Sequence, residues 1–348
     1  MPKFRQTSKR VTILDVAHAS GLSRATVSLV LRESPLVAEQ TRQHVQEVMQ
    51  NLGYVYHRPA ANLRTQKSHT VGLIVNDITN PFFAEMTVSI ESQLDKANYI
   101  SLLCNTSEML NKQERLFSTM QEYSADGILL SPARGTPPST IKKLQKCGLP
   151  FVLFGRHLPG LQVDYVGADN VVGARTAVEH LISLGHRKIA FIGGHPSTSP
   201  RQEREQGWRE AHINHNLLIH EAFVIDTPTT REGGSHAILQ LLQLADRPTA
   251  CLCFNDVVAF GVMLGLQSMG LKPGADFAVI GFDDVAEAAM IRPALTTMAV
   301  SPRRIGEEAV KLLLNLIENP NQPPRNIILR PQLVIRESCG SHSQGRKI

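Results

Sequence analysis

The stretch VTILDVAHASGLSRATVSLVL, residues 11–31, decides how the N-terminal part of this chain folds. Thr12 and Asp15 have the spacing of a capping box, in which each side chain accepts a hydrogen bond from the other residue's backbone. The pattern predicts a helix over residues 13–20, followed by Gly21, a residue type that commonly ends helices. The stretch therefore opens with one short, capped helix.

Two further helices are predicted directly after it. Ser23 is placed to cap a helix over residues 24–31, and a third helix over residues 38–52 stops at Gly53. Two helices joined by a short turn that contains glycine have the spacing of a helix-turn-helix. The side chains expected to face its core are Val16, Ala17, Leu22, Val27, Val30, Val45 and Val48.

The charge of the chain is concentrated at this end. Residues 1–70 contain ten Lys or Arg and four Asp or Glu, a net charge of +6, whereas the rest of the chain carries −1. A basic segment beside a nearly neutral remainder is typical of a part that binds a polyanion. The alternative, a three-helix bundle with a basic solvated face, does not explain this segregation.

In a helix-turn-helix the start of the second helix enters the major groove of DNA. Arg24 and Ala25 are therefore the first candidates for base contact, with Leu29 one turn further on. Arginine donates two hydrogen bonds to guanine, whereas alanine and leucine offer apolar contact to a thymine methyl group. The residues expected to donate to phosphates instead are Thr12, Ser23, Thr26, Ser28 and Thr41.

From residue 70 onward, short apolar runs alternate with helical patterns. The runs TVGLIV, ISLLCNT, DGILLSP and PFVLFGR precede Asp169, and KIAFIGG, AFVID, ACLCFN and FAVIGFDD follow it. Apolar strands separated by helices are typical of parallel sheets covered on both faces. The predicted fold class is therefore α/β: an N-terminal all-α helix-turn-helix domain and two doubly wound parallel-sheet lobes.

Open parallel sheets bind ligands outside the carboxyl ends of their strands. This rule selects Asn76, Asp77, Asn80, Phe82, Phe83, Ser131, Arg156, Arg204, Asn255 and Asp283 as candidate ligand-binding residues. Carboxylates, amides, arginines and aromatic faces together suit a polar, hydroxyl-rich ligand such as a sugar. Other interpretations remain open: Asp77 and Asp283 as helix caps or interlobe contacts, Phe82 as a core residue, and Asn80 as the start of a turn.

Several motifs together resemble the lactose/galactose repressor family of bacterial transcription regulators. They are the quoted N-terminal stretch, TRQHVQEVMQNLGY, RPAANLRT, VGLIVNDITNPFFAE, LGHRKIAFIGG and VIGFDD, and they span nearly the whole chain. ATVSLVL and HRPAANLR are slightly more similar to the maltose-regulon branch than to the lactose branch. The resemblance implies two lobes like those of periplasmic sugar-binding proteins, crossed by three connections, with a ligand cleft between them.

The resemblance also assigns roles to single residues. Residues 57–68 would form a hinge that folds on DNA, with Leu63 as the wedge at the central base step, Ala60 close to it and Arg58 near phosphates. Pro59 fits only in the first turn of such a helix, and a flexible linker is the alternative. Arg204 matches a family pocket motif. The polar stretch DTPTTREGG stands where some relatives stack a ring, which argues against an aromatic-ring ligand.

The resemblance thus predicts a ligand-responsive repressor that binds a near-palindromic operator as a homodimer, controlled by a sugar-like effector and needing no cofactor. The expected domains are residues 1–57 (DNA-binding), 58–69 (hinge), 70–339 (ligand binding and dimerisation) and 340–348 (tail). Lobe 1 is expected over about 70–168 and 298–327, and lobe 2 over about 169–297 and 328–339. The tail lacks the leucine heptads that make some relatives tetramers, and release by an inducer or binding with a corepressor both stay open.

The sequence offers no signature of an enzyme or a metal site. It has no G-x-S-x-G, P-loop, H-E-x-x-H or dinucleotide fingerprint. The histidines of HINH and His220 are expected on a solvated surface, and the five scattered cysteines are expected to be ordinary buried thiols. A sugar-processing enzyme with a basic arm and a constitutive DNA-binding protein remain alternatives.

The N-terminus has no apolar signal region, and the chain has no run of about 18 uninterrupted apolar residues. A cytoplasmic, nucleoid-associated bacterial protein with no membrane partner is therefore expected, and a secreted binding protein is disfavoured.

Overall fold

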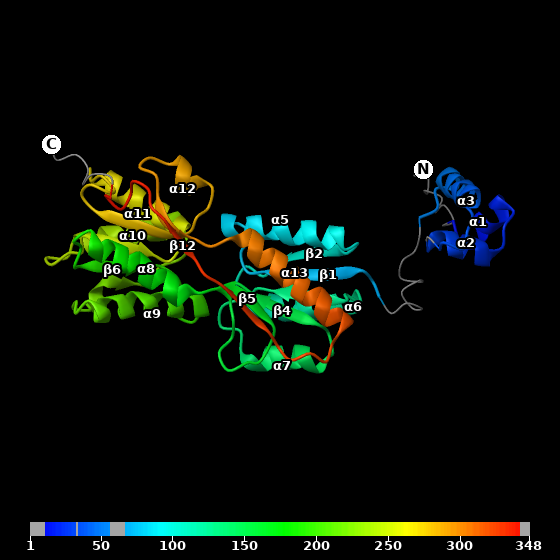
Figure 1. The fold of residues 1–348 in the computed structure, drawn as a ribbon, viewed down its shortest axis with the longest axis horizontal. Coiled ribbons are helices and arrows are strands. Elements are labelled where there is room, and N and C mark those ends of the chain that lie inside the picture. The colour runs from blue at the N-terminus through cyan, green and yellow to red at the C-terminus, as the bar shows by residue number, and fades with distance from the viewer. Residues whose placement is uncertain (1–10, 33, 56–66, 342–348) are drawn as a thin grey trace, which may run out of the picture. The chain divides into compact units, whose positions relative to one another are not determined.

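The computed structural model describes residues 11–32, 34–55 and 67–341. The chain divides into two compact units, residues 1–68 and residues 69–348. Figure 1 draws both units as ribbons.

The first unit contains the three predicted helices, α1 (Ile13–Ser20), α2 (Arg24–Leu31) and α3 (Glu39–Leu52). Thr12 and Asp15 form the capping box, and Gly21 ends α1 with φ of 67°. Ser23 caps α2 by accepting from the Thr26 N–H at 3.0 Å. The helix-turn-helix predicted from the sequence is confirmed.

The core of this unit consists of the predicted apolar side chains. Val16, Ala17, Val27, Val30 and Val45 are buried, and Leu22 and Val48 pack against them half-buried. Helices this short are marginal alone in water, so their packing against one another stabilises them.

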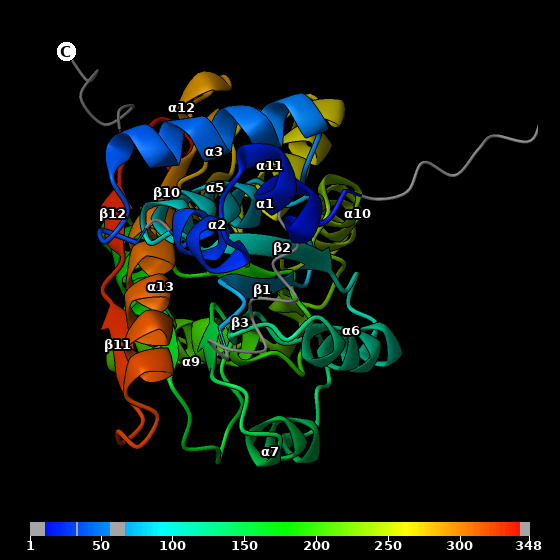
Figure 2. The ribbon, with the colours of Figure 1, turned by 90° about the vertical axis from the view of Figure 1, so that its right-hand side faces the viewer.

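The second unit contains two lobes, each built on a six-stranded sheet. In the order in which they pair, the strands of lobe 1 are β11 (Asn326–Leu329), β5 (Tyr165–Ala168), β4 (Phe151–Phe154), β3 (Gly127–Leu130), β1 (Thr70–Val75) and β2 (Ile100–Asn105). All of these pairs are parallel. Helices α5 (Pro81–Lys96) and α13 (Pro302–Glu318) cover one face, and α6 (Leu110–Glu122) and α7 (Pro138–Lys146) cover the other (Figure 2).

Lobe 2 repeats this plan. Its strands pair in the order β12 (Gln332–Val334), β10 (Thr296–Ala299), β9 (Ala278–Asp283), β8 (Ala250–Cys253), β6 (Ile189–Ile192) and β7 (Val224–Ile225). Helices α8 (Asn170–Ser183) and α9 (Ser199–Asn214) pack together, as do α10 (Arg231–Leu242) and α11 (Asp256–Ser268) on the other side (Figure 1). The short elements η1 (Glu221–Phe223) and α12 (Glu287–Met290) complete the lobe. The predicted α/β class and the two lobes are confirmed.

Three connections join the lobes, as the resemblance implied. They run from β5 to α8, from β10 to α13 and from β11 to β12. β10 stays in lobe 2 as far as Ala299, so the second crossing lies slightly beyond the expected boundary at 297. β11 stays in lobe 1 as far as Leu329, so the third crossing lies slightly beyond the expected boundary at 327. The strands themselves carry polar residues, so the hydrophobic pattern does not mark their ends.

Each sheet has strands that the apolar runs did not predict. β10 has two threonines among its four residues, β11 and β12 lie at the edges of their sheets, and β5 is a buried strand of only four residues. β12 also departs from the all-parallel expectation, because it pairs with β10 antiparallel. An edge strand reached by a short connection from the other lobe is free to run in this direction.

The cysteine expectation holds only in part. Cys251, Cys253 and Cys339 are buried, but Cys104 is half-buried and Cys147 is exposed at the end of α7. Over the ranges that the structure describes, no helix combines the length and apolarity needed to cross a membrane.

Candidate functional site

The start of α2 presents the residues predicted to contact bases. Arg24 and Ala25 are exposed in the first turn, and Leu29 lies half-buried one turn further on. Within the described residues 11–32 and 34–55, Arg24 has no ion-pair partner. A free guanidinium at the N-terminus of the exposed helix is available to a ligand in solution.

The hydroxyl groups predicted to meet phosphates lie around the same helix, but several already have partners. Thr12 donates to the Asp15 carboxylate at 2.7 Å, Ser23 and Thr26 share a 2.9 Å hydrogen bond, and Ser28 accepts from Arg32 at 2.6 Å. Thr41 is half-buried in the first turn of α3. Arg32 was not predicted, and its place on the exposed side of α2 is a consequence of the 3.6-residue helical period.

Arg58, Ala60 and Leu63, the predicted hinge contacts, lie outside the described residues. Their roles stay predictions.

A cavity of about 290 Å³ lies between the two lobes. Nine of the ten predicted ligand-binding residues line it: Asn76, Asp77, Asn80, Phe82, Phe83, Arg156, Arg204, Asn255 and Asp283. The tenth, Ser131, is fully buried just beneath, where it donates to the Asn76 side chain at 2.8 Å. The carboxyl ends of strands from both sheets therefore converge on this cavity, which we call the effector pocket.

Two asparagines of the effector pocket also cap helices. The Asn80 side chain accepts from the Phe82 N–H and the Asn255 side chain from the Val258 N–H, each at 3.0 Å. Asn80, whose alternative interpretation was the start of a turn, is the N-cap of α5 and also lines the pocket. Because the cap uses the carbonyl oxygen of each amide, the NH₂ group remains to donate.

Arg204 and Asp283 form the buried charged centre on the lobe 2 side. Their side chains approach to 3.8 Å, and Arg204 also donates to Asn170 at 2.9 Å and to the Phe254 carbonyl oxygen. The guanidinium lies 3.7 Å above the Phe282 ring centroid, a cation–π contact. Burial raises the pKa of Asp283 well above its usual value although Arg204 opposes the shift.

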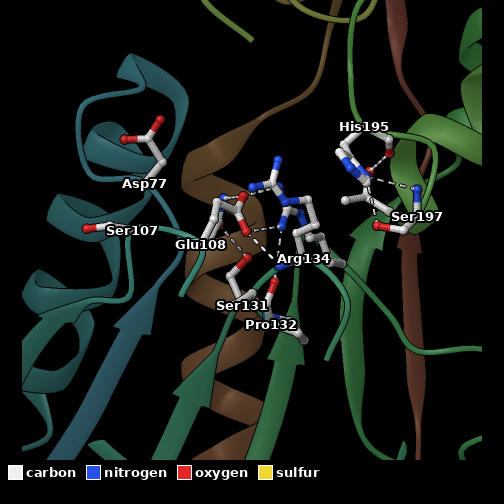
Figure 3. Close-up of polar contacts among 12 residues, drawn as sticks. Asp77, Ser107, Glu108, Ser131, Pro132, Arg134, His195 and Ser197 are labelled. Atoms are coloured by element: carbon white, nitrogen blue, oxygen red, sulfur yellow. Dashed lines mark hydrogen bonds and ion pairs between the residues drawn. The ribbon is translucent and has the colours of Figure 1, made fainter. Parts of the chain in front are cut away.

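Glu108 and Arg156 form a second charged pair, on the lobe 1 side (Figure 3). The Arg156 guanidinium donates to both carboxylate oxygens of Glu108, at 2.8 and 3.0 Å, and to the Pro132 carbonyl oxygen at 3.1 Å. Glu108 also accepts from the Asn76 amide at 3.1 Å and from the Arg134 N–H at 2.7 Å. Burial would raise the pKa of Glu108, but the hydrogen bonds and charge of Arg156 hold it below its usual value.

Sequence reasoning missed Glu108 and five other lining residues: Ser107, Gly155, Pro200, Thr229 and Phe254. A signal was present, because Ser107 and Glu108 follow β2 and Phe254 follows β8, at carboxyl ends where the rule applies. Ser107 and Glu108 have positive φ values of 53° and 60°, a conformation uncommon outside glycine. Such backbone geometry is often found at functional sites.

The polar stretch DTPTTREGG supplies only Thr229 to the pocket, and the ring of Phe254 in lobe 2 comes from outside that stretch. One expectation about a side chain is wrong. His212, expected in solvent, is buried against Trp208, whose carbonyl oxygen lies 2.8 Å from its Nδ1. In the described part of the chain no group of His, Cys, Asp and Glu could hold a metal ion.

Comparison with known proteins gives consistent results for both units. Residues 12–56 match the model of bacterial regulatory proteins of the lacI family, and residues 178–339 match a periplasmic binding protein-like domain. The HTH-type transcriptional regulator DegA of Bacillus subtilis is 32% identical over 331 residues, 94% of this chain and 98% of the relative. The HTH-type transcriptional repressor PurR of Photobacterium profundum is 32% identical over 94% of this chain and 98% of its own length.

Among solved structures, the transcriptional regulator CelR in complex with cellobiose is 30% identical, with a TM-score of 0.73 over 94% of this chain and 100% of that one. The helix-turn-helix, the two lobes and the matched lengths agree. This chain belongs to the lacI family of bacterial regulatory proteins.

Proposed function

We propose that this chain is a transcriptional repressor that binds a near-palindromic operator as a homodimer under the control of a sugar-like effector. The observation that carries the proposal is the pairing, in one chain, of an independent helix-turn-helix unit with a polar pocket between two lobes. Such a pocket changes shape whenever the lobes move relative to each other.

The DNA contacts follow from the exposed face of α2. Arg24, Ala25 and Leu29 would read base edges, and Arg58, Ala60 and Leu63 would act in the minor groove. Thr12, Ser23, Thr26, Ser28 and Thr41 would contact phosphates. Thr12, Ser23, Thr26 and Ser28 already form hydrogen bonds within the protein. Their main contribution to DNA binding would therefore be a rigid contact surface, with fewer free hydroxyl donors for phosphates.

A dimer is supported by apolar side chains left in solvent on the second unit. Val88 on α5 and Leu103 on β2 are 67% and 49% exposed, and Leu264 on α11 and Met290 on α12 are 54% and 73% exposed. Figure 1 draws α5, α11 and α12 along the same side of this unit. Exposed apolar patches commonly mark protein interfaces, and one recognition helix alone reads too few bases for a specific site.

The chemistry of the pocket favours an uncharged polyhydroxyl ligand. Arg156 donates to both oxygens of Glu108, and Arg204 already donates to Asn170 and the Phe254 carbonyl oxygen, so neither guanidinium is free to bind an anion. Asn80, Asn255 and Asp77 remain to exchange hydrogen bonds with hydroxyl groups, and the rings of Phe82, Phe83 and Phe254 supply apolar faces. CelR, a structural relative, was solved with the sugar cellobiose.

The switch would operate through the angle between the lobes. A ligand that binds one angle more tightly shifts the protein toward it, by no more than the difference in binding free energy. That shift would alter the spacing of the two DNA-binding units in the dimer. A protein that acts on chromosomal DNA works in the bacterial cytoplasm, and we infer association with the nucleoid.

The test is a fluorescence-anisotropy titration of a pool of genomic DNA fragments, including the upstream region of the chain's own gene, with and without a panel of sugars. Tight binding to one near-palindrome that a single sugar shifts tenfold is expected, which equals about 1.4 kcal/mol of coupling. Salt-sensitive binding without sequence preference would contradict the repressor assignment. Turnover of the sugar would instead support the alternative of a sugar-processing enzyme.

A further inference from the structure

A second cavity lies between the lobes, beside the connection from β5 to α8. Its volume is about 240 Å³, and it shares no lining residue with the effector pocket. Lobe 1 supplies Tyr165, Asn326 and the loop residue Leu161, while lobe 2 supplies Asn170 and Glu203. We call it the crossover cavity. Because both lobes form its walls, its shape depends on the angle between them.

Tyr165 gives this cavity a hydroxyl group that has no hydrogen-bond partner within the described residues. The residue is only 5% exposed, yet none of the residues that the structure describes hydrogen-bonds to its hydroxyl group. A Cβ atom at position 167 would collide with that hydroxyl group, so Gly167 is what allows the phenol to lie along β5. Buried tyrosine hydroxyl groups usually have a partner. Burial and the nearby Glu203 charge raise the pKa of Tyr165, which keeps the phenol protonated and able to donate.

The charged groups of the cavity already have partners. One Glu203 oxygen contacts His157 and the other accepts from Asn170 at 2.7 Å. Asp169 caps α8 by accepting from the Val172 N–H at 3.1 Å. No lysine or arginine of residues 67–341 lines the cavity, so an anion has no counter-charge there. The remaining walls include Leu161 and other apolar side chains, which favour a ligand with an apolar body.

One side chain connects this cavity with the effector pocket. The Asn170 NH₂ donates to Glu203, and the Asn170 carbonyl oxygen accepts from Arg204, which lines the effector pocket. A ligand that moves Glu203 therefore acts on Arg204 through a single amide. The shapes of both cavities depend on the same interlobe angle.

We infer that the crossover cavity is a second small-molecule site, which takes an uncharged compound with an apolar body and one hydrogen-bonding group that pairs with Tyr165. Its occupancy biases the interlobe angle, a regulatory consequence that rests on the proposed function. The binding itself does not depend on DNA or on the sugar effector.

The experiment is a ligand-observed NMR titration of the full chain with benzyl alcohol, benzylamine and benzoate, which share a shape and differ in charge. Benzyl alcohol is expected to bind at millimolar concentration and benzoate not to bind. Tyr165→Phe should raise the Kd for benzyl alcohol roughly fivefold through loss of one hydrogen bond. Leu161→Trp, which fills the cavity, should abolish binding, whereas Asp77→Asn in the effector pocket should leave it unchanged.

Three outcomes would overturn the inference: no binding of benzyl alcohol, equal binding of benzoate, or the same Kd in the Tyr165→Phe and Leu161→Trp variants as in the parent. Hydrogen exchange tests the regulatory part, because benzyl alcohol should slow amide exchange both in the loop 157–164 and in α9. Slowing confined to one lobe would contradict an effect on the interlobe angle. Failure of the operator titration would leave these results intact, so the two proposals fail separately.

Discussion

The Arg156 guanidinium is held by both carboxylate oxygens of Glu108, which itself stands in a left-handed backbone conformation with φ of 60°. The pair ties the loop after β2 to the loop after β4. Asn76, at the end of β1, joins it through its amide. The lobe 1 wall of the effector pocket is therefore one hydrogen-bonded unit.

Glu108→Gln should lower the free energy of unfolding by about 2 kcal/mol at neutral pH, because a largely buried arginine loses its counter-charge. The pKa of Glu108 is lowered in the folded state, so its stabilisation is present above the unfolded pKa and lost as pH falls through the folded one. Urea unfolding at neutral and acid pH checks this. A deficit of equal size at both pH values, or an equal deficit in the exposed control Glu122→Gln, would contradict it.

Arg24→Ala should reduce discrimination at one base pair by about 1–3 kcal/mol, because the side chain is exposed at the start of α2 and free to pair with guanine. Operator and scrambled DNA are compared by anisotropy at several salt concentrations. Arg115→Ala removes an equal charge from an exposed position on α6, and it should change neither the affinity for the operator nor the affinity for scrambled DNA. A parallel loss on both DNAs would mean that Arg24 contacts only phosphate.

Leu63→Ala should weaken operator binding while leaving most salt-dependent, non-specific binding intact, because an apolar wedge acts only where the duplex bends. The measurement is the ratio of the two affinities at a fixed salt concentration. An unchanged ratio would remove Leu63 from the proposed minor-groove contact.

Leu264→Asp and Val88→Asp should shift the protein toward monomer, since each places a charge on an apolar side chain proposed to be buried between two copies. Sedimentation velocity over a range of concentrations gives the dissociation constant. Ile213→Asp on α9 is the matched control, because that side chain is 64% exposed on a different helix of lobe 2. An equal effect of all three changes would refute the proposed dimer face.

Asp256→Asn should flatten the pH dependence of stability between about pH 4 and 6. Burial raises the pKa of Asp256 to about 6, although hydrogen bonds from Thr297 and the Val285 N–H oppose the shift. A carboxyl whose pKa is raised on folding binds more protons in the folded state, so stability falls as pH rises through this window. Chemical unfolding should show that the free energy of unfolding of the variant, relative to that of the parent, is about 1–3 kcal/mol higher at pH 7 than at pH 4.5. An identical pH profile would exclude Asp256 as the titrating group.

The sequence by itself determined most of the architecture. The helix caps, the three-residue turn and the segregated charge define the first unit, because caps and turns are local interactions among neighbours in the chain. The alternation of apolar runs and helices predicts two sheets, and the ends of those runs predict most of the effector pocket. Parallel topology brings all carboxyl ends to one edge, so this part of the site follows from connectivity alone.

Only the tertiary structure decided which of these side chains interact. The pairing of Glu108 with Arg156 joins loops that are far apart in the chain. His212 is buried because it packs on Trp208, one helical turn away, and Trp208 in turn is hydrogen-bonded to strand β6. The polar strand β10 and the edge strands β11 and β12 form because they add to existing sheets, not because their own pattern requires it. The crossover cavity likewise exists only where two lobes meet, since Tyr165 has no visible role until Gly167 and Glu203 lie beside it.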